Sequence, residues 1–201
     1  MQNTVYEYGQ GLYFNLTNKC PCRCTFCVRS LTSGLGSAAN LWLEAEPGAR
    51  QVIAQLEGME LKNYTEAVFC GFGEPFCALE PMLEVCAYLK SREDCPPVRI
   101  NTNGLGDLIN ARQTPPLLAS LVDVVSISLN APTGERYDQL CRPAFGEGSF
   151  EAMLKFAREC KEFVPQVIFS VVGSVLTPEE TAACEKIADG LGIPLRVRGD
   201  V

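Results

Sequence analysis

The feature that most constrains the fold is a regular alternation of short apolar runs with segments of helical pattern along most of the chain. The apolar runs are rich in β-branched and aromatic residues, which is typical of strands. Strands are expected at residues 5–8, 11–16, 67–70, 98–102, 122–129, 167–172 and 194–197. Several of these runs are apolar throughout, which favours a parallel sheet covered by helices.

The segments between the strands predict helices. They are expected at residues 47–58, 79–90, 115–121 and 149–163, with a last one from 177 to 190 or 192. Ser149 is expected to cap one helix, and Thr177 caps the last one with Pro178 in its first turn. The segment 30–39 is rich in Gly, Ser and Ala and is expected to form a flexible loop or lid. The class is therefore α/β, and the pattern leaves an open, a doubly wound and a barrel-like sheet as alternatives.

Composition narrows the protein class. A chain of 201 residues fits a single domain spanning 1–201, and its net charge of −7 argues against a nucleic-acid partner held through phosphates. No apolar run approaches the roughly 20 residues that cross a bilayer, so no membrane association is expected. Residues 1–10 show no export signal, and we expect a cytoplasmic protein.

Four thiols crowd into one short loop after the second strand, in the stretch Cys20-Pro21-Cys22-Arg23-Cys24-Thr25-Phe26-Cys27. Thiolates are soft ligands that select iron–sulfur clusters, zinc or copper(I). The spacing of Cys20, Cys24 and Cys27 suits three corners of a cubane cluster. Cys22 lies in the wider gap, and its side chain is expected to point elsewhere.

The rest of the composition favours iron over zinc. The chain contains no histidine, and no second C-x-x-C follows to complete a structural zinc site. The total of 11 cysteines is odd and no leader is seen, which disfavours a disulfide framework. A cubane held by three thiolates keeps one iron open for an external ligand.

This C-x-x-x-C-x-x-C loop, with the aromatic Phe26 before its last cysteine, resembles the signature of the radical S-adenosylmethionine (SAM) superfamily. The resemblance implies a [4Fe-4S] cluster on Cys20, Cys24 and Cys27, with SAM bound at the open iron near Phe26. It also implies reductive cleavage of SAM to a 5'-deoxyadenosyl radical that abstracts hydrogen from a substrate. The expected fold is then a partial (β/α)6 TIM-like barrel.

Three further motifs resemble elements of the same family. Gly71-Phe72-Gly73-Glu74-Pro75 is similar to its G-G-E-P element, with Phe72 in the place of a glycine. The resemblance implies that Gly71, Phe72, Gly73 and Glu74 line the cofactor, with Gly73 and Glu74 at the methionine ammonium. The T-N-G and S-L-D elements are matched by 101–104 and 128–130, which implies cofactor contacts for Asn101, Asn103, Ser128 and Asn130. Asn130 replaces the acid of that motif.

Several residues outside these motifs are also candidates. Arg142 offers a bidentate fork for a carboxylate of cofactor or substrate, and Arg198 lies on the last strand near the active end. Cys141 is expected to lie near that end as well, where a thiol can return a hydrogen atom to a product radical. Each has an ordinary alternative, namely a solvated arginine or a buried cysteine.

Along almost its whole length the chain most resembles the small TatD-associated radical SAM proteins. This resemblance does not identify a substrate, which is expected to be a small molecule or a peptide. A reductant such as flavodoxin or ferredoxin is implied as a partner. A glycyl-radical activating enzyme, a deazapurine-forming type of dehydratase, a non-catalytic iron–sulfur electron carrier and a zinc module stay as alternatives.

Overall fold

The computed structural model describes residues 3–199 and contains a seven-stranded sheet whose strands lie in chain order. The first strand pairs antiparallel with the second, and all later pairs are parallel. The strands are β1 (Val5–Tyr8), β2 (Gly11–Phe14), β3 (Glu66–Phe69), β4 (Val98–Thr102), β5 (Val124–Ser128), β6 (Gln166–Val172) and β7 (Leu195–Arg198).

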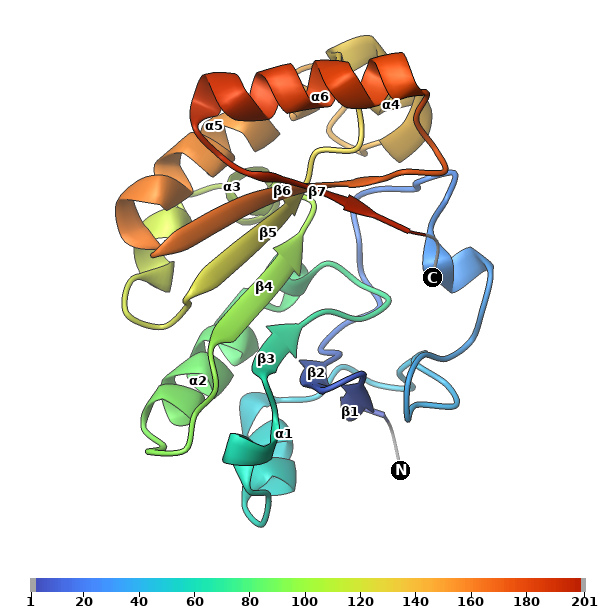
Figure 1. Cartoon of the computed structure of the whole chain (residues 1–201). Helices are drawn as coiled ribbons and strands as arrows, with labels where there is room; N and C mark the ends of the chain where they lie inside the picture. Colours follow the sequence, from blue (N-terminus) through green and yellow to red (C-terminus); the bar gives the residue numbers. More distant parts are fainter. Residues whose placement is uncertain (1–2, 200–201) are drawn as a thin grey trace.

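Helices connect the parallel strands and cover the outer face of the sheet (Figure 1). They are α1 (Ala49–Leu56), α2 (Leu79–Lys90), α3 (Gly106–Asn110), α4 (Gly134–Cys141), α5 (Ser149–Phe163) and α6 (Pro178–Leu191), with 3-10 turns η1 (Val28–Ser30), η2 (Leu61–Asn63), η3 (Pro75–Ala78) and η4 (Pro115–Leu118). None of the helices described between residues 3 and 199 has the length and apolar character needed to cross a membrane.

The strand order decides among the three sheets that the sequence left open. Each parallel connection steps to the next strand in the same direction, and right-handed connections of this kind place all helices on one face. A doubly wound sheet needs a reversal of direction, and the strand order has none between β2 and β7. With β1 and β7 at its edges, the sheet is a partial (β/α)6 barrel, as predicted.

The two faces of the sheet differ in chemistry because side chains alternate along each strand. On the face toward the helices lie the fully buried Phe69, Ile100, Ile127 and Phe169, which belong to the main hydrophobic core. Full burial of one such side chain contributes roughly 1.5–3 kcal/mol. The opposite face, which lines the interior of the barrel, carries mainly polar side chains: Tyr13, Glu66, Arg99, Asn101, Ser126, Ser128, Ser170, Arg196 and Arg198.

Several predicted elements differ in detail from the structure. Gly148, with φ of 88°, caps α5, whereas the predicted cap Ser149 is the first helical residue and its hydroxyl donates to the carbonyl of Gly146. The glycine adopts the left-handed conformation more easily than serine does. The expected helix at 115–121 is the short turn η4, and the predictions included neither α3 nor α4.

The segment predicted to be a flexible loop is held against the first strand. The backbone N–H of Ser37 donates to the carbonyl of Glu7 at 2.8 Å, and the Ser37 hydroxyl accepts from the Glu7 N–H at 2.8 Å. Ala38 is buried in a small second core with Tyr6, Leu41 and Phe72. This loop therefore forms one wall beside the site.

Candidate functional site

The four-cysteine loop follows β2 and lies at the carboxyl ends of the strands, where parallel α/β proteins place their chemistry. A second segment, at the end of α4, fixes the loop through the backbone. Arg23 N–H donates to the carbonyl of Cys141 at 3.0 Å, and Thr25 N–H donates to that of Leu140 at 2.9 Å. The loop is thus positioned by residues more than a hundred positions away.

The Cys22 thiol lies in hydrogen-bond contact with the thiols of both Cys20 and Cys24. This corrects the expectation that Cys22 points elsewhere. Cys22 is buried, and its backbone forms a bridge with Pro143, so its side chain is held inside the loop rather than outside it. Cys20, Cys24 and Cys27 are partly exposed, as ligands open to a cluster need to be.

The electrostatics of the loop favour thiolates at two of the predicted ligands. Hydrogen bonds from Cys141 and Cys22 lower the pKa of Cys24 to about 4. A hydrogen bond from Cys22 also lowers the pKa of Cys20, whereas burial raises that of Cys27. Because the thiolate is the form that binds metal, Cys24 and Cys20 are prepared to act as ligands.

The thiols of the loop are donors of the kind that an iron–sulfur cluster uses. Within residues 3–199, no three or more His, Cys, Asp or Glu side chains are grouped so that they could hold one metal ion. A cubane takes each thiolate at a different iron, so its ligands need not converge on one point. Three half-buried thiols on one loop, two of them with lowered pKa values, provide suitable donors at Cys20, Cys24 and Cys27.

Glu74 joins the ends of two strands. Its carboxylate accepts from the Thr102 hydroxyl at 2.7 Å, from the Asn103 N–H at 2.7 Å and from the Phe76 N–H at 3.3 Å. Burial raises the pKa of Glu74 to about 7, against the opposing effect of these hydrogen bonds. The predicted contact of Glu74 with a methionine ammonium is not tested by these bonds, but they fix the carboxylate beside the cysteine loop.

The glycines of the 71–75 turn allow close approach of two parts of the chain. A Cβ atom on Gly73 would lie 2.2 Å from the Thr17 carbonyl oxygen, and one on Gly71 would lie 2.1 Å from Asn15 Oδ1. The Glu74 N–H donates to the carbonyl of Lys19 at 2.8 Å across this contact. These glycines therefore let the turn pack directly on the base of the cysteine loop, and their predicted contact with a cofactor stays a prediction.

Phe72 and Phe26 pack on different sides of the site. The Phe72 ring is buried and contacts the Trp42 ring at 5.2 Å between centroids, and the Phe72 carbonyl accepts from Arg29 at 3.3 Å. Phe26 is partly buried against the main core. The Phe72 side chain therefore supports the turn from the side of the loop at 31–42.

Three buried amide oxygens at the strand ends have no hydrogen-bond partner among the described residues. They are the Oδ1 atoms of Asn15, Asn101 and Asn130. A buried polar atom without a partner costs about 1–3 kcal/mol, so such atoms mark places where a ligand is expected. SAM offers an ammonium, ribose hydroxyls and an adenine amine as donors, which suit the oxygens of Asn101 and Asn130, whereas Asn15 Oδ1 packs against Gly71.

The amide nitrogens of these strand-end residues are already used. Asn15 donates to the carbonyl of Leu41 at 2.6 Å, the Asn101 side chain bonds to the Cys70 thiol, and that of Asn130 bonds to the Cys141 thiol. Asn103 directs its amide at the sulfur of Cys22 at 3.6 Å. These bonds orient the side chains, and in the first three residues they leave the oxygen as the open group.

The structure separates the remaining candidates. Cys141 is buried against Cys24, and Ser128 lies on the inner face of β5. Arg198 lies on the inner face of β7, where burial lowers its pKa. Arg142, in contrast, caps α4 with φ of 47° and is exposed, in a surface hollow that it shares with Arg23. It therefore lies on the outer side of the cysteine loop.

Asn15 and Cys70 directly follow β2 and β3, at the active end where their places in the sequence predicted them. Arg99 was not predicted as a site residue. Arg99 lies two residues before Asn101 in β4, and its position in an apolar strand could have marked it as a buried cation.

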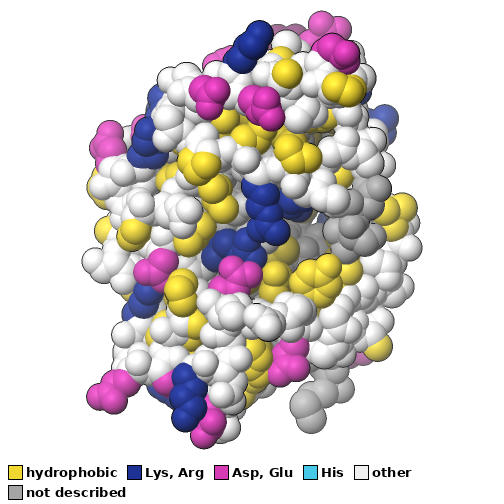
Figure 2. Space-filling view, viewed as in Figure 1, with side chains coloured by type: hydrophobic (Ala, Val, Ile, Leu, Met, Phe, Trp, Pro, Cys, Tyr) yellow, Lys and Arg dark blue, Asp and Glu magenta, His cyan; other side chains and the backbone are white. Residues whose placement is uncertain are grey.

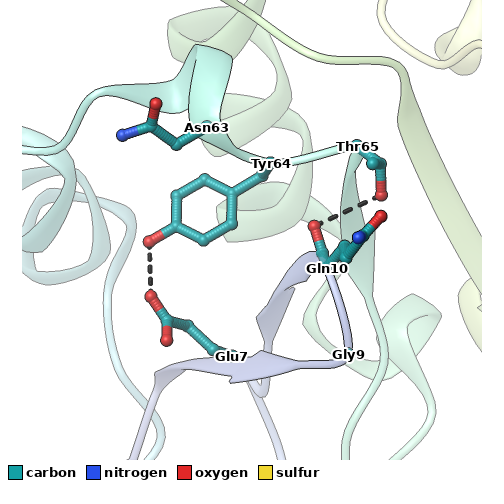
Figure 3. Close-up of a pocket in the computed structure, with 6 residues that line it drawn as sticks. All are labelled: Glu7, Gly9, Gln10, Asn63, Tyr64 and Thr65. Atoms are coloured by element: carbon teal, nitrogen blue, oxygen red, sulfur yellow. Dashed lines mark hydrogen bonds between the residues drawn. The ribbon is translucent and has the colours of Figure 1, made fainter.

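A hollow of about 500 Å³ lies at the other end of the sheet (Figure 3). It is lined by Glu7, Gly9 and Gln10 from the β1–β2 hairpin and by Asn63, Tyr64 and Thr65 before β3. The Tyr64 hydroxyl donates to Glu7 at 2.6 Å, and the Thr65 hydroxyl donates to the Gln10 carbonyl at 3.2 Å. This hollow is at the amino end of β2 and contains none of the cysteines.

Comparisons with known proteins agree with this geometry. No curated protein matches the chain. The [FeFe]-hydrogenase maturase HydG aligns with a TM-score of 0.66 at 15% identity, over 99% of this chain and 44% of its own. Streptococcus suis SuiB bound to the precursor peptide SuiA aligns with a TM-score of 0.64 at 15% identity, over 98% of this chain and 40% of its own. Methylornithine synthase (PylB) aligns with a TM-score of 0.63 at 13% identity, over 99% of this chain and 55% of its own.

The chain spans between 40% and 55% of the length of these three proteins, and at such identities the similarity shows the fold. The sequence itself supplies the family, because the model of the radical SAM superfamily matches residues 14–189. That match includes the cysteine loop and the carboxyl ends of β2 to β6. The chain belongs to the radical SAM superfamily.

Proposed function

We propose that the protein is a radical SAM enzyme that binds one [4Fe-4S] cluster through Cys20, Cys24 and Cys27 and binds SAM at the open iron. When bound, this pair supplies one-electron cleavage of SAM to a 5'-deoxyadenosyl radical, which abstracts hydrogen from the substrate. The observation that carries the proposal is the loop of partly exposed thiols facing strand ends with unpartnered amide oxygens. A plain electron carrier has no need of those acceptors.

The residues of the chain have separate tasks in this proposal. The amide oxygens of Asn101 and Asn130 accept from SAM, and Ser128 lies on the same face to contact the ribose. Gly71, Phe72, Gly73 and Glu74 form the turn that holds the cysteine loop against the strand ends. Asn103 donates toward the Cys22 sulfur and so holds the loop from β4.

Cys141 is proposed as the thiol nearest to the chemistry. It contacts Cys24 and the side chain of Asn130, which places it between a cluster ligand and a cofactor contact. Return of a hydrogen atom from Cys141 to a product radical stays a prediction. The hydrogen bond to Cys24 supports a role in orienting this ligand.

The substrate and the reductant are proposed only as classes. SuiB is described bound to its precursor peptide, which supports a peptide as one substrate class beside small molecules. Flavodoxin or ferredoxin would provide the electron. Membership among the TatD-associated proteins, a cytoplasmic location and relation to glycyl-radical activating enzymes or deazapurine-forming dehydratases stay as hypotheses.

The test compares cysteine variants after anaerobic reconstitution with iron and sulfide. We expect Cys24→Ser to lose most of the iron and the absorbance near ~400 nm, because one corner of the cubane is no longer held. Cys95→Ser is the matched control, since Cys95 precedes β4 at the opposite end of the sheet. Cys22→Ser is expected to keep its iron, which would separate Cys22 from the three ligands beside it.

The same samples are then given dithionite and SAM, and 5'-deoxyadenosine is measured. Wild type and Cys95→Ser are expected to form it, and Cys24→Ser is not. A wild-type protein with a full cluster but no product would identify an electron carrier instead. A colourless protein that holds zinc would reject the iron–sulfur assignment, because zinc has a filled d shell.

A further inference from the structure

Three arginines lie on the inner face of the barrel. Arg99 comes from β4, and Arg196 and Arg198 come from β7. The strand registers place all three on the same face of the curved sheet, and the charges of Arg99 and Arg196 act on Arg198. Figure 2 shows Lys and Arg side chains gathered at the centre of the face that β7 crosses in Figure 1.

Two of these guanidinium groups keep donors without a partner. Arg99 is only 8% exposed, and its Nη2 donates to Glu66 at 2.7 Å and to the Tyr13 hydroxyl at 3.4 Å. The buried Nε atoms of Arg99 and Arg198 have no hydrogen-bond partner among the residues that the structure describes. A buried guanidinium donor without an acceptor is costly, because the charge has lost its water and gained nothing in exchange.

The charges on this face do not balance. Glu66 is the carboxylate that pairs with Arg99, and among the described strand residues of the inner face it is the one acid beside three arginines. Burial lowers the pKa of Arg198, the nearby Cys70 thiol opposes this effect, and the charges of Arg196 and Arg99 lower the pKa further. The whole chain has a net charge of −7, but this interior is positively charged, so a bound anion would stabilise it.

We propose that the interior of the barrel binds an anionic group of the substrate, a carboxylate or a phosphate, through Arg99, Arg196 and Arg198. Planar guanidinium groups bind such oxyanions through two parallel hydrogen bonds, which fix orientation as well as charge. Arg99 precedes Asn101 by two residues on the inner face of β4, so it lies roughly 7 Å deeper along the strand. The anionic group is therefore held inside the barrel, between Arg99 below the end of β4 and Arg198 at the end of β7, and the rest of the substrate extends toward the cysteine loop.

This inference rests on the proposed function only in assigning the anion to a substrate, so its test uses the protein without a cluster. The melting temperature is measured at constant ionic strength while inorganic phosphate or succinate replaces chloride. Saturable stabilisation by either anion is expected, and the more effective one identifies the group. Stabilisation no greater than that by chloride overturns the proposal.

Variants locate the binding. Arg198→Gln removes one guanidinium and is expected to weaken anion binding about tenfold or more, as loss of a charge-assisted hydrogen bond does. Arg50→Gln, on the exposed side of α1, is the matched control and keeps the wild-type affinity. Arg99→Gln is a second variant, with the same expected loss of anion binding. If it does not fold because Glu66 loses its partner, the double variant Arg99→Gln and Glu66→Gln is measured instead. Equal affinity in wild type and Arg198→Gln rejects the site, whatever the 5'-deoxyadenosine assay shows.

Discussion

The polar side chains at the two ends of the sheet differ in whether they have hydrogen-bond partners. At the amino end, the hydroxyls of Tyr64 and Thr65 have partners (Figure 3). Asp94 also accepts from the Leu61 N–H at 2.8 Å. At the carboxyl end, the amide oxygens of Asn101 and Asn130 are buried without one. The amino end is completed by the chain itself, whereas the carboxyl end leaves acceptors for a ligand.

The largest expected effect comes from Gly73→Ala, which tests whether the carboxyl end depends on close backbone approach. The new Cβ would lie 2.2 Å from the Thr17 oxygen and 2.7 Å from that of Lys19. Backbone cannot yield cheaply, so we expect a loss of more than about 2 kcal/mol in the free energy of unfolding, together with poor cluster loading. Urea unfolding and iron content measure the two effects.

Gly190→Ala is the control for this change. Gly190 lies within α6 and has no neighbouring atom near the added Cβ. Alanine in a helix interior is expected to stabilise by about 0.5–1 kcal/mol. Similar small effects at both glycines would show that the turn adjusts freely, and would remove the steric argument.

A second prediction concerns the buried carboxylate that joins the strand ends. The pKa of Glu74 is raised from 4.5 to about 7 by burial, so the folded state holds the proton more tightly than the unfolded state does. The stability from this effect is complete below pH 4.5 and is lost as the pH rises through about 7. We expect a change of roughly 3 kcal/mol over that window in the protein without a cluster.

Glu74→Gln isolates this contribution. The amide cannot titrate, so the free energy of unfolding of the wild type should fall relative to that of the variant as the pH rises. The lost hydrogen bonds add a penalty that does not depend on pH. The exposed Glu57→Gln provides the reference, and parallel pH profiles for wild type and Glu74→Gln would contradict the prediction.

The smallest effect is expected at the amino end, with Tyr64→Phe. The tyrosine donates to Glu7 in an exposed position, and burial and this carboxylate raise the pKa of Tyr64 to about 12. Loss of the hydroxyl should cost less than about 1 kcal/mol and leave iron content unchanged. A clear loss of cluster in this variant would mean that the two ends of the sheet are coupled, and would contradict the contrast drawn between them.

Local patterns predicted each of the seven described strands but not all helices. α6 is a clear case, since Thr177 accepts from the Glu180 N–H, Pro178 opens the helix and Gly192 ends it with φ of 59°, as expected. α4 escaped prediction because its apolar positions are few and its cap, Thr133, lies close after Pro132. At α5, the glycine before Ser149 took the cap because the chain enters that helix in a left-handed conformation.

The candidate site was predicted in its parts rather than in its contacts. The motifs identified the loop and the strand-end amides, because residue types and spacing are local properties. They did not show that Cys22 contacts its neighbours, or that the turn at Gly73 packs on Thr17. Whether Glu74 meets a ligand stays a prediction, although its three donors are now known.

The sequence by itself determined the alternation of strands and helices, and with it the parallel sheet and the thiol loop at the carboxyl end of β2. These follow from periodicity and spacing over short stretches of chain. Only the tertiary structure decided that Cys141 lies against Cys24 and that arginines from β4 and β7 share the interior. Such contacts join residues far apart in sequence, and the curvature of the sheet brings them together.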